Sequence, residues 1–287
     1  MGVLQVDEAT YRGLNRWSWS TAKHVLDCPA EALDQRQRPI SETDAMKIGT
    51  LMHALILEPE TVGDRYVVVP EIVKGLGGWT YSNAGVTWRT KKEAEAALFA
   101  GMGDRVPVTR ALMTECELRC KGPREAVEAW GVEAEVAMIG QIEGCAAKGK
   151  ADGVSGRILL DVKTTADVKP DAIGRAAVQR RWLGQLWTYR ELAKQSGFAV
   201  EEVGVMVVQA PKASGNPLKL STSRQPRRSW RTLWLDDHAL RYGESEARRV
   251  WRAIRDCEAA EDWPDYPTGP LVLPRWAREV EIEEEAF

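Results

Sequence analysis

The chain has 287 residues, of which 44% are hydrophobic and 28% are charged. This composition is typical of a globular protein with a substantial core, and it excludes a fibrous or mostly disordered chain. No stretch approaches about eighteen consecutive apolar residues, so we expect no transmembrane helix and no membrane association. The N-terminus lacks a basic region followed by an apolar core, so we expect no secretory signal and a cytoplasmic location.

Charge is distributed unevenly along the chain, whose formal net charge is −3. The segment from Glu279 to Glu285 carries five glutamates, so the rest of the chain has a net charge of +2. The arginines gather in three stretches: Arg175, Arg180, Arg181 and Arg190; Arg224, Arg227, Arg228 and Arg231; and Arg248, Arg249, Arg252 and Arg255. Such stretches can hold phosphate groups, although each can equally be a solvated helix face.

The five cysteines stand at scattered positions, and only Cys116 and Cys120 lie close together. An odd, scattered set in a cytoplasmic chain argues against a disulfide framework. No second close pair completes a zinc or iron–sulfur site, so we expect neither kind of metal centre.

Residues 1–130 are predicted to form a mainly helical lead, because apolar residues recur there with helical spacing. Ser41 and Asp44 resemble a helix-capping pair, and Pro29 can divide the first helix. The expected elements are a helix at 17–33, a helix that is capped at Ser41 and continues until Pro59, helices at 91–102, 107–120 and 123–130, a strand at 66–69, and a glycine-rich, irregular and mobile loop at 74–90.

From residue 132 the apolar pattern changes to the period of two that is typical of strands. The expected elements are strands at 132–139, 145–154 and 158–163, a helix at 170–195, strands at 203–209 and 230–235, and a helix that begins at 236 or 237 and ends near 260. This order predicts an α/β fold with a central mixed β-sheet flanked by helices. We expect residues 131–287 to form the core and to pack with the lead as a single domain.

The passage with the most chemical information lies in two neighbouring strands of this core. Because side chains alternate along a strand, Asp161 and Lys163 face the same side, and Val162 faces the other. Asp152 ends the preceding strand of the hairpin and can reach that side. Two carboxylates beside an ammonium group suit Mg²⁺, which prefers hard oxygen ligands and leaves other positions to water and phosphate. An Asp-x-Lys tripeptide can also be a surface salt bridge, so the surrounding context decides.

That context resembles the PD-(D/E)xK nuclease superfamily, and within it the RecE-like (exonuclease VIII type) branch of the RecB-like nucleases. The matching pieces follow one another in the family's order. They are Trp19-Ser-x-x-Lys23, Leu26-Asp-Cys-Pro29, Gly49-Thr-Leu-Met-His53-Ala-Leu-Ile-Leu-Glu-Pro59, the Glu135 strand, Lys148-Gly-Lys-Ala-Asp152, Asp161-Val-Lys163-Thr-Thr, Gln185-x-x-x-Tyr189, Trp263-Pro-x-Tyr266 and Leu273-Pro-x-Trp276. The resemblance implies a restriction-endonuclease-like core behind a helical lead that carries His53.

The resemblance also implies roles for individual residues. Asp152, Asp161 and the Val162 carbonyl would bind the catalytic metal, and Lys163 would be the catalytic lysine. His53 is similar to a histidine that adds a metal ligand in the family, although a histidine in an apolar helix is more often a core residue. The metal would be Mg²⁺, for which Mn²⁺ can substitute.

Further residues are implied to assist catalysis or to contact DNA. Glu135 resembles an acidic residue that assists the metal site through water, although Glu133 and Glu135 could equally mark an exposed strand face. Gln185 and Tyr189 are four residues apart, so they share one helix face, where the family contacts the DNA backbone. Arg181 lies one turn earlier and can add a phosphate contact. Thr164 and Thr165 are implied to hydrogen-bond near the metal.

The resemblance implies a Mg²⁺-dependent exonuclease that degrades linear double-stranded DNA from its ends, in the 5′→3′ direction, in phage-type recombination. The implied partners are double-stranded DNA, a single-strand annealing protein, and further copies of the chain in a ring-shaped homo-oligomer. Two alternatives remain open: a structure-specific or single-strand nuclease in repair or defence, and a DNA-binding module without cleavage activity. Iron–sulfur relatives carry clustered cysteines after the nuclease motifs, whereas Cys257 stands alone there.

Overall fold

The computed structural model describes residues 2–4, 8–38, 42–81, 84–100, 102–211, 229–266 and 268–269. Several features of the sequence lie outside these residues. They are Ser41, the arginines Arg224, Arg227 and Arg228, the Leu273-Pro-x-Trp276 motif and the glutamate-rich segment 279–285. The prediction of a cap at Ser41 is wrong, because the helix begins at Asp44 and the Thr43 hydroxyl accepts a hydrogen bond from the Met46 amide.

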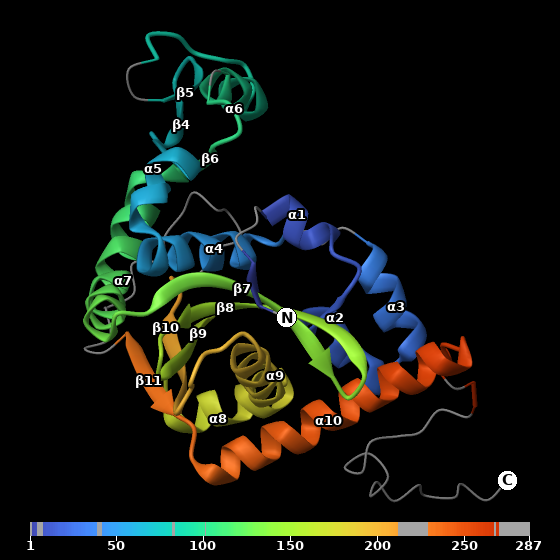
Figure 1. Ribbon diagram of the computed structural model, residues 1–287. Coiled ribbons are helices and arrows are strands. Elements are labelled where there is room, and N and C mark those ends of the chain that lie inside the picture. Colours follow the sequence, from blue (N-terminus) through green and yellow to red (C-terminus); the bar gives the residue numbers. More distant parts are fainter. Residues whose placement is uncertain are drawn as a thin grey trace, which may run out of the picture.

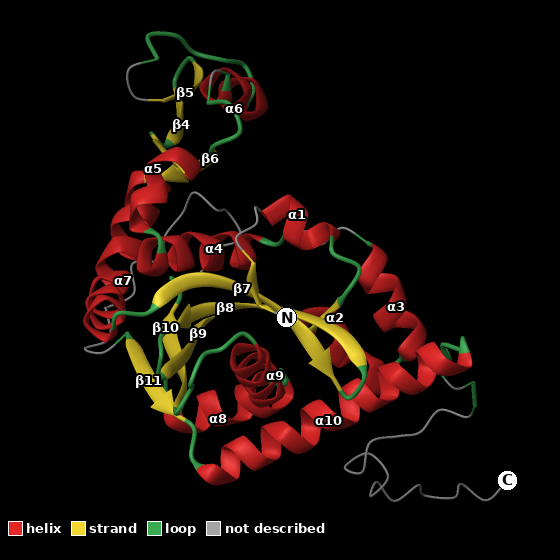
Figure 2. Cartoon of the chain, viewed as in Figure 1, coloured by secondary structure: helices red, strands yellow, loops and turns green. Residues whose placement is uncertain are grey.

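A twisted mixed sheet forms the centre of the molecule (Figure 2). Within the described residues it has seven strands, of which six follow the order β1-β7-β8-β9-β10-β11, while β2 pairs with β8. The strands are β1 (Gly2–Leu4), β2 (Trp17–Ser18), β7 (Glu133–Ile142), β8 (Cys145–Val154), β9 (Ile158–Thr165), β10 (Glu202–Gln209) and β11 (Trp230–Trp234). The β9–β10 and β2–β8 pairs are parallel and the others antiparallel. The prediction of a mixed sheet is confirmed.

Helices cover both faces of this sheet (Figure 1). Helices α4 (Asp44–Leu57) and α7 (Arg110–Trp130) lie on one face, and α9 (Trp182–Gln195) lies on the other, with α10 (Asp237–Ala260) packed against it. The strands supply both cores by alternation: Leu160 and Val162 belong to the core under α4 and α7, whereas Leu159 belongs to the core around α9. The expected helices flanking the sheet are therefore present.

The N-terminal helices pack along one end of the sheet. They are α1 (Glu8–Gly13), α2 (Trp19–Ala22), a 3-10 turn (Lys23–Leu26) and α3 (Pro29–Gln37). As expected, Pro29 divides the predicted helix 17–33: it takes the first position of α3, and the Cys28 thiol accepts a hydrogen bond from the Glu31 amide. The segment after α10 returns to this region, where Trp263 stacks on Trp17 and the Tyr266 hydroxyl donates to Glu31.

A small arm projects from the body above α4 and α7 (Figure 1). It contains a 3-10 turn (Pro59–Thr61), α5 (Val62–Arg65), β3 (Tyr66–Val69), β4 (Ile72–Gly75), β5 (Gly78–Tyr81), α6 (Lys91–Phe99) and β6 (Val106–Thr109). The expectation of an irregular loop at 74–90 is wrong for its first part, because β4 and β5 pair as an antiparallel hairpin there. The sequence lacks regular apolar alternation here, and the hairpin forms through backbone pairing across a tight turn.

Two further element boundaries differ from the sequence prediction. The helix expected at 170–195 is two helices, α8 (Pro170–Gln179) and α9, because Arg181 adopts a left-handed conformation with φ of 58°. The helices expected at 107–120 and 123–130 are one helix, α7, which contains Pro123 and begins only after strand β6. None of the helices in the described ranges combines the length and the apolar character needed to cross a membrane.

The close packing of α9 against α2 gives a stability prediction. A Cβ atom at Gly184 would lie 2.3 Å from the Trp19 ring, whereas a Cβ atom at Gly174 in α8 would meet nothing within 4 Å. We expect Gly184→Ala to lower the free energy of unfolding by about 1–3 kcal/mol through overpacking. The matched control, Gly174→Ala, should be neutral or stabilising by up to about 1 kcal/mol. Urea unfolding followed by fluorescence measures both, and equal effects would contradict the packing.

Candidate active site

Three acidic residues stand side by side on three neighbouring strands. The β7–β8 register pairs Ala134 with Gly153 and Val136 with Ala151, which places Glu135 opposite Asp152. The β8–β9 ladder ends where Gly153 pairs with Leu160, so Asp152 and Asp161 occupy the next opposed position, just beyond the last ladder pair. The acids therefore meet where β8 and β9 separate.

Where the strands separate, the Asp152 carboxylate replaces a backbone carbonyl as the acceptor of a β9 amide. Its Oδ2 accepts a hydrogen bond of 2.6 Å from the Val162 amide, which would otherwise lack its ladder partner on β8. Two residues after Asp161, the Lys163 ammonium lies 2.7 Å from Asp161 Oδ2, and the Asp161 side chain is only 1% exposed. The predicted convergence of two carboxylates and one ammonium group is thus present in the structure.

Glu135 reaches the cluster through an unusual backbone conformation. It has a φ of 55° inside a strand, a left-handed conformation that costs a residue other than glycine about 1–3 kcal/mol. Its side chain is 22% exposed and its Oε2 lies 2.5 Å from the Lys150 ammonium. Such strain persists where the surrounding structure imposes it, and it clusters at functional sites. The interpretation of Glu135 as part of the site is favoured over an exposed strand face.

His53 lies in α4 and contacts the cluster from the face of the sheet that this helix covers. Its Nδ1 lies 3.8 Å from Asp152 Oδ2. One turn earlier, a Cβ atom at Gly49 would lie 3.1 Å from Thr164 Oγ1, so a glycine there allows α4 to approach β9 closely. Ligand atoms of His53, Glu135 and Asp152 all lie within 4.8 Å of one another, which is a spacing suited to a shared metal ion.

The electrostatics of the cluster favour a bound cation. Burial raises the pKa of both Asp152 and Asp161 to about 6, although the positive charge of Lys163 acts in the opposite direction. A neighbouring carboxylate also contributes to each of these raised pKa values, Glu135 in the case of Asp152 and Asp152 in the case of Asp161. Burial lowers the pKa of His53, so its imidazole is neutral and can act as a ligand.

Lys163 keeps its positive charge in these surroundings. Burial lowers the pKa of its ammonium group, but the attraction of Asp161 and Asp152 outweighs burial, and the net shift is upward. The lysine is therefore a charged donor beside the carboxylates rather than a neutral base.

Helix α9 delivers an amide and a phenol to the same cluster. The Gln185 Nε2 donates to Asp161 Oδ1 at 3.2 Å and lies 3.1 Å from the Tyr189 hydroxyl. A Cβ atom at Gly149 would lie 2.8 Å from the Tyr189 ring, so the ring packs directly on β8. Gln185 and Tyr189 share the helix face that their spacing predicted, and both lie at the carboxylates.

The remaining predicted residues are placed differently. Arg181 forms a double ion pair with Asp27, with both hydrogen bonds at 2.8 Å, and it also donates to the Lys23 carbonyl. Thr164 lies next to Gly49, and the Thr165 carbonyl accepts from Ala210 at the end of the sheet. Asp161 lies outside the group that His53, Glu135 and Asp152 form. The structure shows where these residues lie, and the catalytic, metal-binding and DNA-binding roles of all the predicted site residues stay predictions.

The sequence analysis gave no role to two lysines near the site, Lys148 and Lys150. Lys148, Lys150 and Asp152 alternate along β8, so the period of two already placed them on one face. Lys150 pairs with Glu135, and Lys148, which is 8% exposed, donates to the carbonyls of Tyr11, Arg12 and Leu14, each at 3.0 Å. Lys148 thereby fastens the end of α1 to the sheet.

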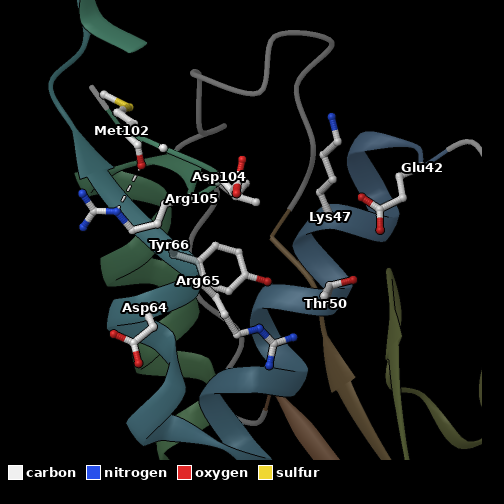
Figure 3. Close-up of a pocket in the computed structure, with 11 residues that line it drawn as sticks. Glu42, Lys47, Thr50, Asp64, Arg65, Tyr66, Met102, Asp104 and Arg105 are labelled. Carbon is white, nitrogen blue, oxygen red and sulfur yellow. Dashed lines mark hydrogen bonds between the residues drawn. The ribbon is translucent and has the colours of Figure 1, made fainter. Parts of the chain in front are cut away.

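An open cleft of about 1050 Å³ reaches the cluster. Its walls come from α1, α4, β7 and β8, and they include His53, Glu135, Lys150 and Lys163. A second cavity of about 640 Å³ continues toward the arm, and it shares Glu42, Thr50 and Arg65 with the cleft. Figure 3 shows this second cavity between α4 and the arm.

The comparisons with known proteins agree with this geometry. Residues 18–269 match the model of a protein family described as a PDDEXK-like domain of unknown function. The chain belongs to this family. It is therefore a member of the PD-(D/E)xK superfamily, as the sequence motifs predicted.

A solved structure shows the same fold. This PDDEXK-like chain is similar to a protein from Eubacterium rectale that is provisionally described as an exonuclease, with a TM-score of 0.58 and 14% identity, over 97% of this chain and 100% of the other. It also matches a phage-related exonuclease from Haemophilus somnus 129PT at 14% identity, over 70% of this chain and 100% of the other, with a TM-score of 0.34, which supports no argument. No curated protein sequence matches the chain.

A dependence of stability on pH and metal follows from the pKa values of Asp152 and Asp161. Because these values are near 6 in the folded protein, above the ordinary 3.8, the two groups make the metal-free protein less stable as pH rises from about 4 to about 6. Above that window both are charged and can bind a cation. A cation at a hundredfold excess over its Kd should then add about 2.7 kcal/mol to the free energy of unfolding. Each kcal/mol corresponds to about 2–4 °C in Tm.

Thermal melts with and without Mn²⁺ or Ca²⁺, at pH 5 and pH 8, test this expectation. The cation should raise Tm by several degrees at pH 8 and by much less at pH 5. An equal rise at both values would show that the cation binds elsewhere.

Proposed function

We propose that this PDDEXK-like protein is a divalent-metal-dependent DNA exonuclease that hydrolyses phosphodiester bonds of linear double-stranded DNA from its ends. The observation that carries the proposal is the row of Glu135, Asp152 and Asp161 where β8 and β9 separate, with His53 on one side and Lys163 beside it. A structural ion pair does not require three adjacent acids, a strained glutamate and a histidine to meet at an open cleft.

The residues fit a divalent cation of the Mg²⁺ or Mn²⁺ type. His53, Glu135 and Asp152 would hold it, and Asp161 and the Val162 carbonyl are proposed as further ligands, as the family resemblance implies. When bound, the cation supplies positive charge that polarises a phosphodiester and makes a nearby water molecule more acidic. The fit rests on the 4.8 Å spacing of the ligand atoms and on carboxylates whose pKa values burial raises.

The side chains around the carboxylates then have distinct tasks. Lys163 would orient the attacking water and stabilise the negative charge that develops on the phosphate. Gln185 fixes Asp161 by its hydrogen bond and would contact the DNA backbone together with Tyr189. Arg181 would need to leave Asp27 before it could bind a phosphate, so we expect its contribution to be smaller.

The finer features of the proposal rest on the resemblance to RecE-like nucleases. They are 5′→3′ direction, a role in phage-type recombination with a single-strand annealing partner, and assembly into a ring of identical subunits. The description of the Eubacterium rectale protein as an exonuclease favours cleavage from DNA ends.

Digestion of linear duplexes labelled at one end, with and without Mg²⁺, tests the proposal. A 5′→3′ exonuclease should release a 5′-terminal label early and a 3′-terminal label on the same strand late. It should leave covalently closed circular DNA intact. Cleavage of the circle would indicate a structure-specific or single-strand nuclease instead. Binding without any cleavage, in Mg²⁺ or Mn²⁺, would indicate a DNA-binding module.

A further inference from the structure

A separate cavity of about 370 Å³ lies between the end of α1 and helix α3. Four cationic side chains line it, and no aspartate or glutamate is among the described residues that do so. The four are Arg12, Arg16, Arg36 and Lys148, and we refer to this space as the cationic cavity. The hydroxyl residues Ser18 and Thr21 also contribute to its wall.

This charge distribution sets the cavity apart from the one in Figure 3. That cavity has three cationic residues and three acidic ones, so its charges balance within the lining. The cationic residues are Lys47, Arg65 and Arg105, and the acidic residues are Glu42, Asp64 and Asp104. Four like charges without a lining carboxylate repel one another, and an anion in the cavity would relieve this repulsion.

Arg16 and Arg36 keep donors for such an anion. A guanidinium has five N–H donors. Arg16 is seen to donate one hydrogen bond, to the Gly140 carbonyl at 3.0 Å. Arg36 donates to Asn15 at 2.6 Å and stacks over Trp17, and the carboxylate that pairs with it, Glu258, is 3.9 Å away. Among the described residues Arg16 has no ion pair, and Arg36 has only the 3.9 Å pair with Glu258, so both guanidinium groups are positioned by the protein and still have donors for an anion.

The cavity is connected to the active site through β8 and α1. Lys148 lies at the cavity and Asp152 at the active site, four residues apart on one face of β8, which corresponds to about 13 Å along the strand. Arg12 lines both the cationic cavity and the active-site cleft. One nucleic-acid strand bound in the cleft can therefore extend to the cavity, where a phosphate group is the anion that it carries.

We infer that the cationic cavity binds a phosphate group of the DNA substrate, with Arg16 and Arg36 as its donors. The inference rests on the proposed nuclease function and adds a second anchor for DNA, remote from the reacting phosphate. The phosphate can be the terminal group of a DNA end or an internal phosphodiester, since both present the same oxygen acceptors.

The test is DNA binding by the double variant Arg16→Gln/Arg36→Gln, measured by fluorescence anisotropy without divalent metal, so that no cleavage is needed. We expect an affinity loss on the order of tenfold and a salt dependence that is less steep by about one phosphate contact. The charge-retaining variant Arg16→Lys/Arg36→Lys should keep most of the affinity. Thermal melts of both variants report whether the protein remains folded.

A matched control removes two positive charges elsewhere. Arg124→Gln/Arg157→Gln changes one arginine on α7 and one at the β8–β9 turn, each of which pairs with an exposed glutamate. If this control loses as much affinity as Arg16→Gln/Arg36→Gln, or if neither variant loses any, the inference is overturned. A folded Arg16→Gln/Arg36→Gln protein with weaker binding supports it, even if the parent cleaves no DNA and the proposed function fails.

The source of the phosphate is separated with duplexes that carry a 5′-phosphate, a 3′-phosphate or only hydroxyl ends. A preference of the parent for one phosphorylated end that disappears in Arg16→Gln/Arg36→Gln supports a terminal phosphate. An equal loss of affinity for all three duplexes supports an internal one.

Discussion

Replacing Lys163 by alanine is expected to lower the rate of DNA cleavage by about 10²–10³-fold while DNA binding persists. The physical reason is that Lys163 is a charged donor held 2.7 Å from Asp161, and in the proposed mechanism it stabilises the negative charge that develops on the phosphate. Binding should persist because the phosphate contacts that we propose for other residues do not depend on this ammonium group. Single-turnover digestion and anisotropy binding measure the two quantities separately.

Loss of Lys163 also leaves Asp161 without its cation, which can weaken the fold. Thermal melts therefore accompany the kinetics, and Lys163→Arg, which keeps the charge, should retain the fold while it restores only part of the rate. Lys194→Ala is the matched control, because that lysine pairs with Glu191 on the exposed side of α9. A Lys163→Ala protein that cleaves DNA at the parent rate would refute the catalytic assignment.

Replacing Asp152 by asparagine is expected to stabilise the metal-free protein and to abolish both cleavage and metal binding. At pH 8 the buried Asp152 carboxylate is charged at a cost, since its pKa is raised to about 6. A neutral amide removes that cost, so the free energy of unfolding should rise by about 1–3 kcal/mol. The side-chain oxygen of the Asp152→Asn variant can still accept the Val162 amide hydrogen, so the local backbone should remain in place.

Urea unfolding at pH 8 and Mn²⁺ titration followed by Tm measure these effects. The rise in Tm that Mn²⁺ gives to the parent should be absent in Asp152→Asn. Asp256→Asn, on the exposed surface of α10 beside Arg255, is the control and should change neither property. A destabilised Asp152→Asn protein that still responds to Mn²⁺ would place the metal away from this carboxylate.

The sequence predicted the core of the fold well because its strands and helices are strongly periodic. The alternation along β7, β8 and β9 matched the observed elements, and it correctly put Asp161 and Lys163 on one side. The arm was predicted less well: the strand at 66–69 was expected, but β4 and β5 were not, because these two strands are fixed by pairing with one another rather than by burial of one face.

Helix boundaries at the site also needed the tertiary structure. Helical spacing runs through 170–195 without interruption, yet the chain breaks at Arg181, whose side chain binds Asp27 from the N-terminal lead. A contact between residues 154 positions apart leaves no local signal in the sequence. Because of this break, α9 runs in a different direction from α8, and Gln185 reaches Asp161.

The amino-acid sequence by itself determined the superfamily, the order of the elements and the identity of the carboxylates, the lysine and the histidine. Only the tertiary structure decided that β8 and β9 part at Asp152, that Glu135 turns inward through a left-handed backbone, and that α4 brings His53 to 3.8 Å from Asp152. The periodicity of a strand states which side a residue faces, but the register between strands and the approach of a distant helix depend on packing of the whole core.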